Sequence, residues 1–264
     1  MWHVGRRASL SALFILAFLA IGCQKQNLGS DLPDPNGQFI TVTNDFAPVV
    51  MIVGPQGAGL CTGTVISERA VLTAAHCTLK SGTYTVYTSF GNFMTSNVVS
   101  GGPGVVNDPN DIAILVFDEA IASREEGQIY DIHDSVSTGD TARLVGFGCT
   151  DIIRKTGAGT KRTGTNVVAE IDDYVVFTTP RETNGAVGRG ILGSENRAGS
   201  CFGDSGGPAL VQVDGTYRVI AVTHAGGYSL DTIFSEYVNV ADRSDNRDFI
   251  AGVNSQYNLG IVGL

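Results

Sequence analysis

Short apolar runs, bounded by Gly, Asn, Asp or Pro, recur along the chain from about residue 49 onward. Such runs are typical of strands joined by tight connections. We expect strands over residues 49–53, 63–73, 84–90, 112–117, 141–147, 167–176, 208–213, 217–223 and 232–238. A helical pattern is confined to residues 241–253, where Asn239 or Asp242 is the expected N-cap. The pattern predicts an all-β, antiparallel barrel or sandwich with a short C-terminal helix.

Length and composition agree with this fold class. At 264 residues the chain fits one large β-barrel domain or two closely packed small ones, with enough length to bury a sizeable core. Its 34 glycines are nearly twice the usual share, and 16% of the residues are charged. Internal repeats, heptads and low-complexity tracts are absent from the sequence.

The first 22 residues have the pattern of a signal peptide. Arg6 and Arg7 precede an apolar run over residues 10–21. This run is too short to favour a transmembrane helix over the apolar region of a signal. We therefore expect export across the inner membrane, to the cell envelope or the exterior.

Residues 19–23, Leu-Ala-Ile-Gly-Cys, resemble a bacterial lipobox, in which Cys23 becomes the lipidated N-terminus. Cys23 is the odd one of five cysteines, and a polar linker over residues 23–38 leads to the expected folded domain, residues 39–264. The match is imperfect because Ala20 stands where Leu is usual. The alternative is an ordinary signal peptide with an incidental cysteine.

The charge of the chain limits its partners. Without residues 1–22 the formal net charge changes from −9 to −11, from 15 Lys and Arg against 26 Asp and Glu. An acidic surface repels phosphates, so we do not expect a nucleic-acid partner. Membrane attachment would come from lipid on Cys23 rather than from a basic patch.

Three motifs carry residue types that cooperate in nucleophilic catalysis. They are Thr73-Ala74-Ala75-His76-Cys77, Asn110-Asp111-Ile112-Ala113 and Gly203-Asp204-Ser205-Gly206-Gly207-Pro208. A serine hydroxyl is a poor nucleophile until an imidazole takes its proton and a carboxylate orients that imidazole. The motifs supply one candidate for each role, Ser205, His76 and Asp111, with Asp108 as the fallback for the acid. His133 and His3 look incidental.

Two other interpretations compete. Gly203-x-Ser205-x-Gly207 also matches the nucleophile elbow of α/β-hydrolases, which would make the chain an esterase. That fold has the order Ser, acid, His and needs a strand-to-helix turn, whereas this chain has His, Asp, Ser and a predicted strand after the serine. The segment is also consistent with a simple glycine-rich loop, or with a catalytically silent binding module. The complete set of three motifs in this order favours an enzyme.

Together the motifs resemble the chymotrypsin/trypsin (S1) family of serine endopeptidases, over roughly residues 39–252. The resemblance implies two six-stranded antiparallel β-barrels with a boundary near residues 120–137 and the active site between them. It implies protein or peptide substrates, a monomer, and no metal or organic cofactor. The backbone N–H groups of Gly203 and Ser205 would form the oxyanion hole, where glycine gives the backbone the freedom to turn its N–H inward.

The resemblance also suggests how the cysteines pair. Cys61 and Cys77 match the family's histidine-loop disulfide, whose closure contributes about 3 kcal/mol in the chain-entropy model. Cys201 lacks the family's usual downstream partner, which leaves Cys149 if Cys23 carries lipid. Two disulfides imply an oxidising compartment such as the periplasm or the cell exterior.

Substrate preference is less well defined. Trypsin-like enzymes place Asp six residues before the nucleophile, where this chain has Gly199 followed by Ser200. We therefore do not expect a basic P1 side chain, unless Asp231 reaches the pocket. The opposite wall of the S1 pocket would contain Thr223, His224, Gly226 and Gly227. There His224 either receives an acidic P1 side chain or only packs; otherwise the pocket suits apolar side chains.

Asp204 has another expected role. In zymogen-activated relatives the equivalent carboxylate pairs with a new N-terminal ammonium, which here requires cleavage before Phe39 or Ile40. The similar run Ile52-Val53-Gly54-Pro55 is a decoy, since it lies only nine residues before Cys61. If the N-terminus stays tethered at Cys23, Asp204 needs a different partner.

Overall fold

The computed structural model describes residues 41–105, 107–150, 154–180, 197–228 and 232–264. The predicted signal, lipidation site, linker and cleavage point lie outside these residues, as does Asp231. The described residues all belong to one compact unit. Within the described residues, no helix has the length and apolar character needed to cross a bilayer.

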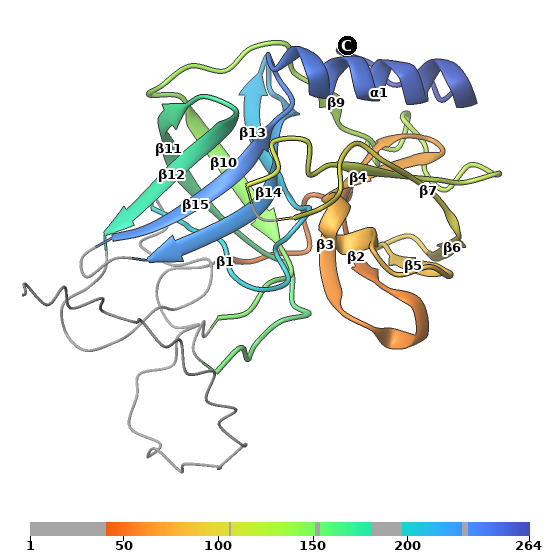
Figure 1. Cartoon of the computed structure of the whole chain (residues 1–264), viewed down its shortest axis with the longest axis horizontal. Helices are drawn as coiled ribbons and strands as arrows, with labels where there is room; N and C mark the ends of the chain where they lie inside the picture. Colours follow the sequence, from red (N-terminus) through yellow and green to blue (C-terminus); the bar gives the residue numbers. More distant parts are fainter. Residues whose placement is uncertain (1–40, 106, 151–153, 181–196, 229–231) are drawn as a thin grey trace, which may run out of the picture. The chain divides into compact units, whose positions relative to one another are not determined.

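The first barrel is a seven-stranded sheet in which every pairing is antiparallel (Figure 1). Its strand order is β6-β5-β2-β3-β4-β8-β7. The strands are β2 (Val49–Val53), β3 (Leu60–Ser67), β4 (Ala70–Thr73), β5 (Tyr84–Tyr87), β6 (Asn92–Thr95), β7 (Asn97–Ser100) and β8 (Ala113–Val116). Ile52 and Val53 lie in β2, which pairs with the strand that contains Cys61.

The second barrel is an eight-stranded sheet with the order β1-β11-β10-β13-β14-β15-β12, and β9 adds to β14 in parallel. Pairing of β11 with β12 closes six of these strands into a ring. The strands are β1 (Thr41–Val42), β9 (Asp131–Ile132), β10 (Thr141–Gly146), β11 (Arg162–Ile171), β12 (Tyr174–Pro180), β13 (Pro208–Val213), β14 (Thr216–Tyr228) and β15 (Thr232–Asn239). The predicted all-β architecture of two antiparallel barrels is confirmed.

Three apolar clusters form the core. One fills the first barrel around Tyr84 and Leu115, and a second fills the other barrel around Phe177. The third contains residues of both barrels, including Leu72 and Leu210, together with Ile250 from the C-terminal helix. Because this cluster is shared, the two barrels pack directly against each other.

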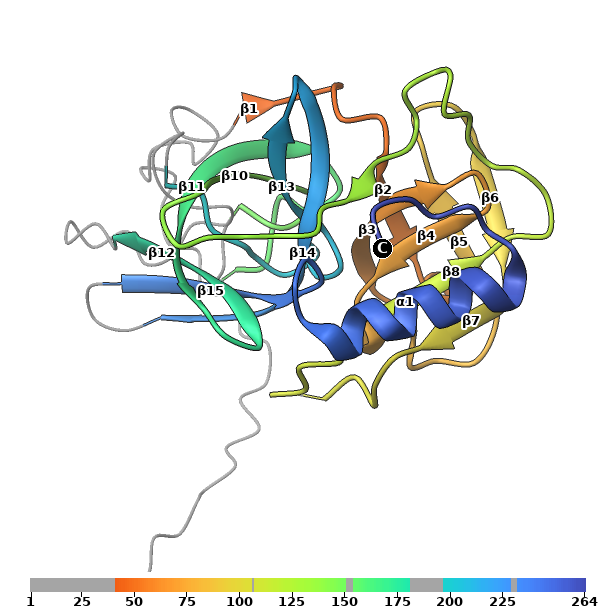
Figure 2. The ribbon, with the colours of Figure 1, turned by 90° about the horizontal axis from the view of Figure 1, so that it is seen from above.

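The predicted C-terminal helix is present as α1 (Ser244–Tyr257), shifted toward the C-terminus from the expected range. Figure 2 shows α1 crossing over the seven-stranded sheet, and the Tyr257 hydroxyl is 3.4 Å from Asn97 Oδ1 of β7. The predicted N-cap is wrong, since Arg243 occupies that position without a side-chain cap hydrogen bond. Asn239 Oδ1 instead accepts the N–H of Ala241 and of Asp242, which forms a turn before the helix.

Two of the predicted strands each span a tight turn. The expected strand over residues 63–73 is split into β3 and β4 at Glu68 and Arg69, and the one over residues 167–176 includes the turn between β11 and β12. Apolar residues continue on both sides of each turn, so periodicity alone does not mark it. Strands β6 and β7 were missed because none of their residues is fully buried.

Candidate active site

His76 lies in a short 3₁₀ turn, η2 (Ala75–Thr78), directly after β4. The Cys61–Cys77 disulfide joins this turn to β3, with the two Cα atoms 6.2 Å apart, which confirms the predicted pairing. Thr78 Oγ1 also donates a hydrogen bond of 2.9 Å to the Ala75 carbonyl. The histidine is therefore held on a covalently tethered turn at the end of a buried strand.

Asp111 fixes His76 through two hydrogen bonds. Its Oδ1 accepts the His76 backbone N–H at 2.7 Å, and its Oδ2 lies 2.6 Å from His76 Nδ1. Burial raises the pKa of Asp111, but hydrogen bonds from His224 and His76 outweigh burial and the net pKa is lowered. The fallback Asp108 instead accepts the N–H of Gly104 and of Asn110, so it shapes the loop before Asp111.

The Ser205 loop is pinned to the first barrel by its backbone. The Ser205 carbonyl accepts the Thr62 N–H at 2.8 Å. The same oxygen lies 3.6 Å from the Sγ atom of Cys77, the residue that follows His76. Gly203 has φ +102°, and a Cβ there would lie 2.9 Å from Leu60 Cδ2. Only glycine combines that backbone conformation with this close approach. The fold thus brings the His76, Asp111 and Ser205 segments together.

Thr62 is a site residue that the sequence reasoning missed. Its side chain is fully buried, and its Oγ1 donates to the Gly203 carbonyl at 2.8 Å while accepting the Phe147 N–H at 3.1 Å. One hydroxyl therefore links β3 of the first barrel to the loop before Ser205. A threonine on an alternating strand gives no sequence signal for such a role.

Asp204 is buried beneath the same loop. Its carboxylate accepts the N–H of Gly148 at 2.7 Å and of Cys201 at 2.8 Å. Burial raises its pKa to about 7, against the lowering effect of these hydrogen bonds and of the charge on Arg162. A Cβ on Gly148 would lie 2.2 Å from a carboxylate oxygen, so that position needs glycine. The predicted Cys149–Cys201 disulfide, with Cα atoms 5.4 Å apart, is confirmed and braces this region.

Most of the predicted S1 residues lie close to one another. The Ser200 N–H donates to Ser235 Oγ at 2.9 Å, and a Cβ on Gly226 would lie 3.6 Å from Ser200 Oγ. Gly227 lies against the Phe234 ring, and Gly199 is buried. Thr223 Oγ1 donates to the Gly207 carbonyl at 2.9 Å. The role of these residues in substrate binding stays a prediction.

His224 has a different neighbour from the one we expected. Its Nδ1 lies 2.5 Å from Asp111 Oδ2, and its ring stacks on Tyr174 with centroids 5.4 Å apart. The side chain is 3% exposed, so it presents almost no surface to a substrate. Neither receiving an acidic P1 side chain nor packing in the pocket wall accounts for its contact with Asp111.

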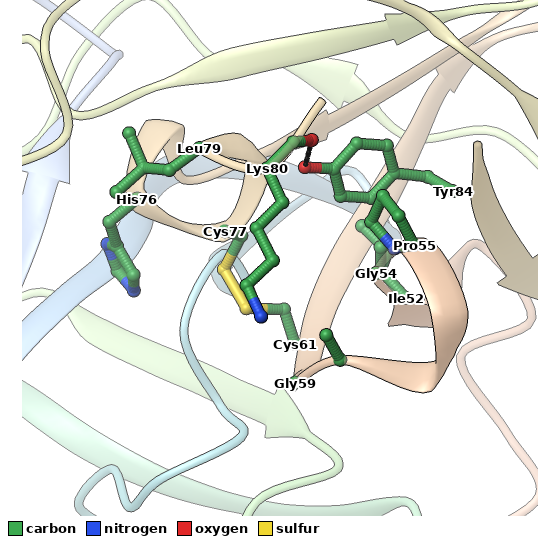
Figure 3. A pocket seen from close by; sticks show the side chains of 11 residues that line it. Ile52, Gly54, Pro55, Gly59, Cys61, His76, Cys77, Leu79, Lys80 and Tyr84 are labelled. Atoms are coloured by element: carbon green, nitrogen blue, oxygen red, sulfur yellow. Dashed lines mark hydrogen bonds between the residues drawn. A yellow bond between two sulfur atoms is a disulfide. The ribbon is translucent and has the colours of Figure 1, made fainter. Parts of the chain in front are cut away.

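A pocket lies beside His76 on the side of the disulfide (Figure 3). It is lined by the turn from Gly54 to Gly59, by the Cys61–Cys77 bridge and by Leu79. The Tyr84 hydroxyl donates to the Lys80 carbonyl at 2.6 Å and closes its far wall. This pocket belongs to the first barrel and is distinct from the predicted S1 residues.

Two groups of described side chains have the composition of a metal site. Cys61, His76 and Cys77 form the first group, but the two cysteine sulfurs are bonded to each other in a disulfide. In the second, Asp111 Oδ2 lies 2.6 and 2.5 Å from the Nδ1 atoms of His76 and His224. Ligands of a tetrahedral zinc ion, each about 2.0–2.1 Å from the metal, are spaced more widely than this. The separations are those of hydrogen bonds.

Comparisons with known proteins agree with this geometry. Among curated proteins, "Trypsin" of Simulium vittatum is 30% identical over 171 residues, which cover 57% of this chain and 66% of that protein. "Serine protease Hayan" of Drosophila melanogaster is 24% identical over 197 residues, 63% of this chain and 30% of that protein. The chain thus spans less than two thirds of the length of these relatives.

Solved structures show the same fold. A Glu endopeptidase in complex with MPD has a TM-score of 0.58 at 18% identity, covering 84% of this chain and 99% of that chain. A mutant of human heparin binding protein (CAP37) has a TM-score of 0.58 at 20% identity, covering 85% of this chain and 98% of that chain. These neighbours share the chymotrypsin-like double barrel. The family model described as Trypsin matches residues 38–245, and the chain therefore belongs to the family of trypsin-like serine proteases.

Proposed function

We propose that the protein is a serine endopeptidase in which Ser205, His76 and Asp111 act together. The observation that carries the proposal is the pair of hydrogen bonds from His76 to Asp111, at 2.6 and 2.7 Å. A carboxylate only accepts hydrogen bonds, so His76 Nδ1 must carry a proton. In the neutral ring this leaves the lone pair on Nε2. An imidazole in this tautomer is a general base for a serine hydroxyl.

In the proposed reaction, Ser205 Oγ forms a bond to the scissile carbonyl carbon while His76 Nε2 takes the hydroxyl proton. The N–H groups of Gly203 and Ser205 stabilise the oxyanion, and one such donor contributes about 3 kcal/mol to the reduction of the barrier. The C–N bond then breaks as His76 returns the proton to the leaving amine. Water releases the acyl group from Ser205 by the same steps in reverse.

The proposed substrates are proteins or peptides with an uncharged P1 side chain. Gly199 stands where a carboxylate would be needed to bind Lys or Arg. Gly226 and Ser200 lie near each other without a charged side chain at either position, which suits an apolar P1 side chain. On the leaving-group side, we infer that the pocket beside His76 receives a residue that follows the scissile bond, because it is bounded by the histidine that protonates the leaving amine.

We also propose that the chain is exported and anchored through lipid on Cys23. Two disulfides support an oxidising compartment, and they account for all the other cysteines. The N-terminal peptide of protein purified from membranes should carry the mass of an acylated cysteine. An unmodified mature chain that begins after Cys23 would contradict the anchor and leave the proposed protease activity untouched.

The proposed activity is tested with a peptide library, a fluorophosphonate probe and the Ser205→Ala variant. The natural chain should cleave peptide amides and react with the probe, and the variant should do neither. Probe labelling without amide cleavage would indicate an esterase, and no labelling would indicate a silent binding module. Full proteolysis by the variant, or a strong preference for Arg or Lys at P1, would contradict the proposal or its specificity.

A further inference from the structure

Asp111 is shared by two histidines. Its Oδ2 lies 2.6 Å from His76 Nδ1 and 2.5 Å from His224 Nδ1, while its Oδ1 accepts the His76 backbone N–H. The carboxylate is fully buried, so water does not supply these hydrogen bonds. A buried carboxylate costs several kcal/mol unless such donors compensate it. His224 is therefore part of what allows Asp111 to be charged.

A β-bulge directs His224 toward Asp111. In the pairing of β14 with β15, Thr223 is opposite Tyr237 and Ala225 is opposite Glu236, so His224 is the extra residue. Bulges of this kind turn a side chain away from the regular alternation of a strand. The Tyr174 ring then stacks on the imidazole, with the two planes 18° apart, and limits its rotation.

The residue before the bulge is bonded to the serine loop. The Thr223 N–H donates to the Gly207 carbonyl, and the Gly206 N–H donates to the Thr223 carbonyl, both at 2.8 Å. His224 therefore connects the Ser205 loop of the second barrel to Asp111 of the first. The same carboxylate holds His76, so the chain of contacts runs from Gly206 and Gly207, which follow Ser205, through Thr223 and His224 to Asp111 and His76.

The surroundings of His224 determine which of its ring nitrogens carries a proton. Nδ1 faces a carboxylate and must donate, while Nε2 is buried with no hydrogen-bond partner among the described residues. A second proton on Nε2 would leave a buried N–H without an acceptor, which is more costly than an unused lone pair. The geometry thus places a proton on Nδ1, between His224 and Asp111.

We propose that His224 is a positioning residue for the reaction, donating its Nδ1 proton to Asp111 so that the carboxylate stays aligned with His76. This inference rests on the proposed peptidase function. It assigns His224 to catalysis through Asp111, with no contact to substrate. Loss of the donor should therefore lower kcat and leave KM unchanged.

The test compares His224→Asn with His224→Leu in the full chain, using the preferred peptide amide from the library. The Asn side-chain N–H₂ can donate near the position of Nδ1, whereas Leu fills a similar volume without a donor. We expect kcat to fall about 10- to 100-fold in the Leu variant, with KM within about twofold, and to recover most of this loss in the Asn variant. Circular dichroism and thermal unfolding check that both variants are folded.

Proton NMR on the Ser205→Ala chain, which does not digest itself, supplies a second readout. Two strongly downfield Nδ1 protons are expected, one from each histidine, and His224→Asn should remove one of them. A single downfield proton in the chain that retains both histidines would overturn the inference even if the Leu variant fails to fold.

The outcomes separate the two proposals. If Ser205→Ala is inactive while His224→Leu keeps the natural kcat, the role of His224 is wrong and the peptidase function stands. A raised KM or an altered P1 preference with unchanged kcat would assign His224 to the substrate pocket instead. Turnover retained by Ser205→Ala would remove the basis of both proposals.

Discussion

Thr62→Val tests whether one buried hydroxyl organises the loop before Ser205. Valine keeps the shape of threonine and removes Oγ1, so the Gly203 carbonyl and the Phe147 N–H both lose their partner. A buried polar group without a partner costs about 1–3 kcal/mol, which gives about 2–6 kcal/mol for the two. Typical domains have about 5–15 kcal/mol of stability, so we expect a folded but clearly weakened protein.

The same substitution should reduce catalysis. The anchored carbonyl belongs to the peptide between Gly203 and Asp204, which lies between the two proposed oxyanion donors. Loss of one oxyanion donor lowers kcat about 10²- to 10³-fold. Loss of the hydrogen bond from Thr62 to the Gly203 carbonyl should displace the donors only in part and lower kcat about tenfold. KM should change little, because Thr62 is buried and has no surface for substrate.

Urea unfolding and steady-state cleavage of a peptide amide measure the two effects. Thr62→Ser is the matched control, since it keeps the hydroxyl and loses one methyl group, worth about 1 kcal/mol. The serine variant should keep kcat close to that of the natural chain. If the valine variant retained both the natural kcat and the natural urea midpoint, the reasoning about Thr62 would be refuted.

Three further predictions concern the same loop and its supports. Gly203→Ala should lower kcat about 100-fold because its Cβ would meet Leu60, while Gly215→Ala, with a similar φ of +79° and nothing within 4 Å, should leave kcat unchanged. Asp204 has a folded pKa of about 7 against a usual value of 3.8, so between these values the folded state binds more protons than the unfolded state. The protein's free energy of unfolding should therefore fall as pH rises through this window, by up to roughly 4 kcal/mol. Urea titrations at several pH values should show this dependence in the natural chain and not in Asp204→Asn. Paired Cys→Ala changes should cost about 3 kcal/mol at Cys61–Cys77 and about 4 kcal/mol at Cys149–Cys201, because the second bridge closes 52 residues against 16. Equal thermal shifts for the two bridges would contradict the loop-length argument.

The sequence supports the reaction type better than the details of the site. Motifs around His76 and Ser205 are local, so their neighbours along the chain reveal them. His224 was predicted either to receive an acidic P1 side chain or only to pack in the pocket wall, because its position in sequence suggested that wall. Its observed direction depends on a bulge in β14 and on Asp111 from the other barrel, neither of which a local pattern encodes. Thr62 was missed for the same reason, since its partners lie 85 and 141 residues away.

The apolar cluster shared by both barrels and α1 has a consequence for how the protein would withstand the proposed peptidase activity. Opening either barrel alone would expose side chains that also form the core of the other, so local opening is costly and unfolding should be cooperative across the whole unit. A peptidase at high concentration meets other copies of itself, and cleavage of a folded protein generally follows the population of its opened forms. By suppressing half-open forms, the shared core would limit autolysis by the proposed peptidase to molecules that have unfolded completely. These molecules would already have lost the candidate active site, which contains residues of both barrels.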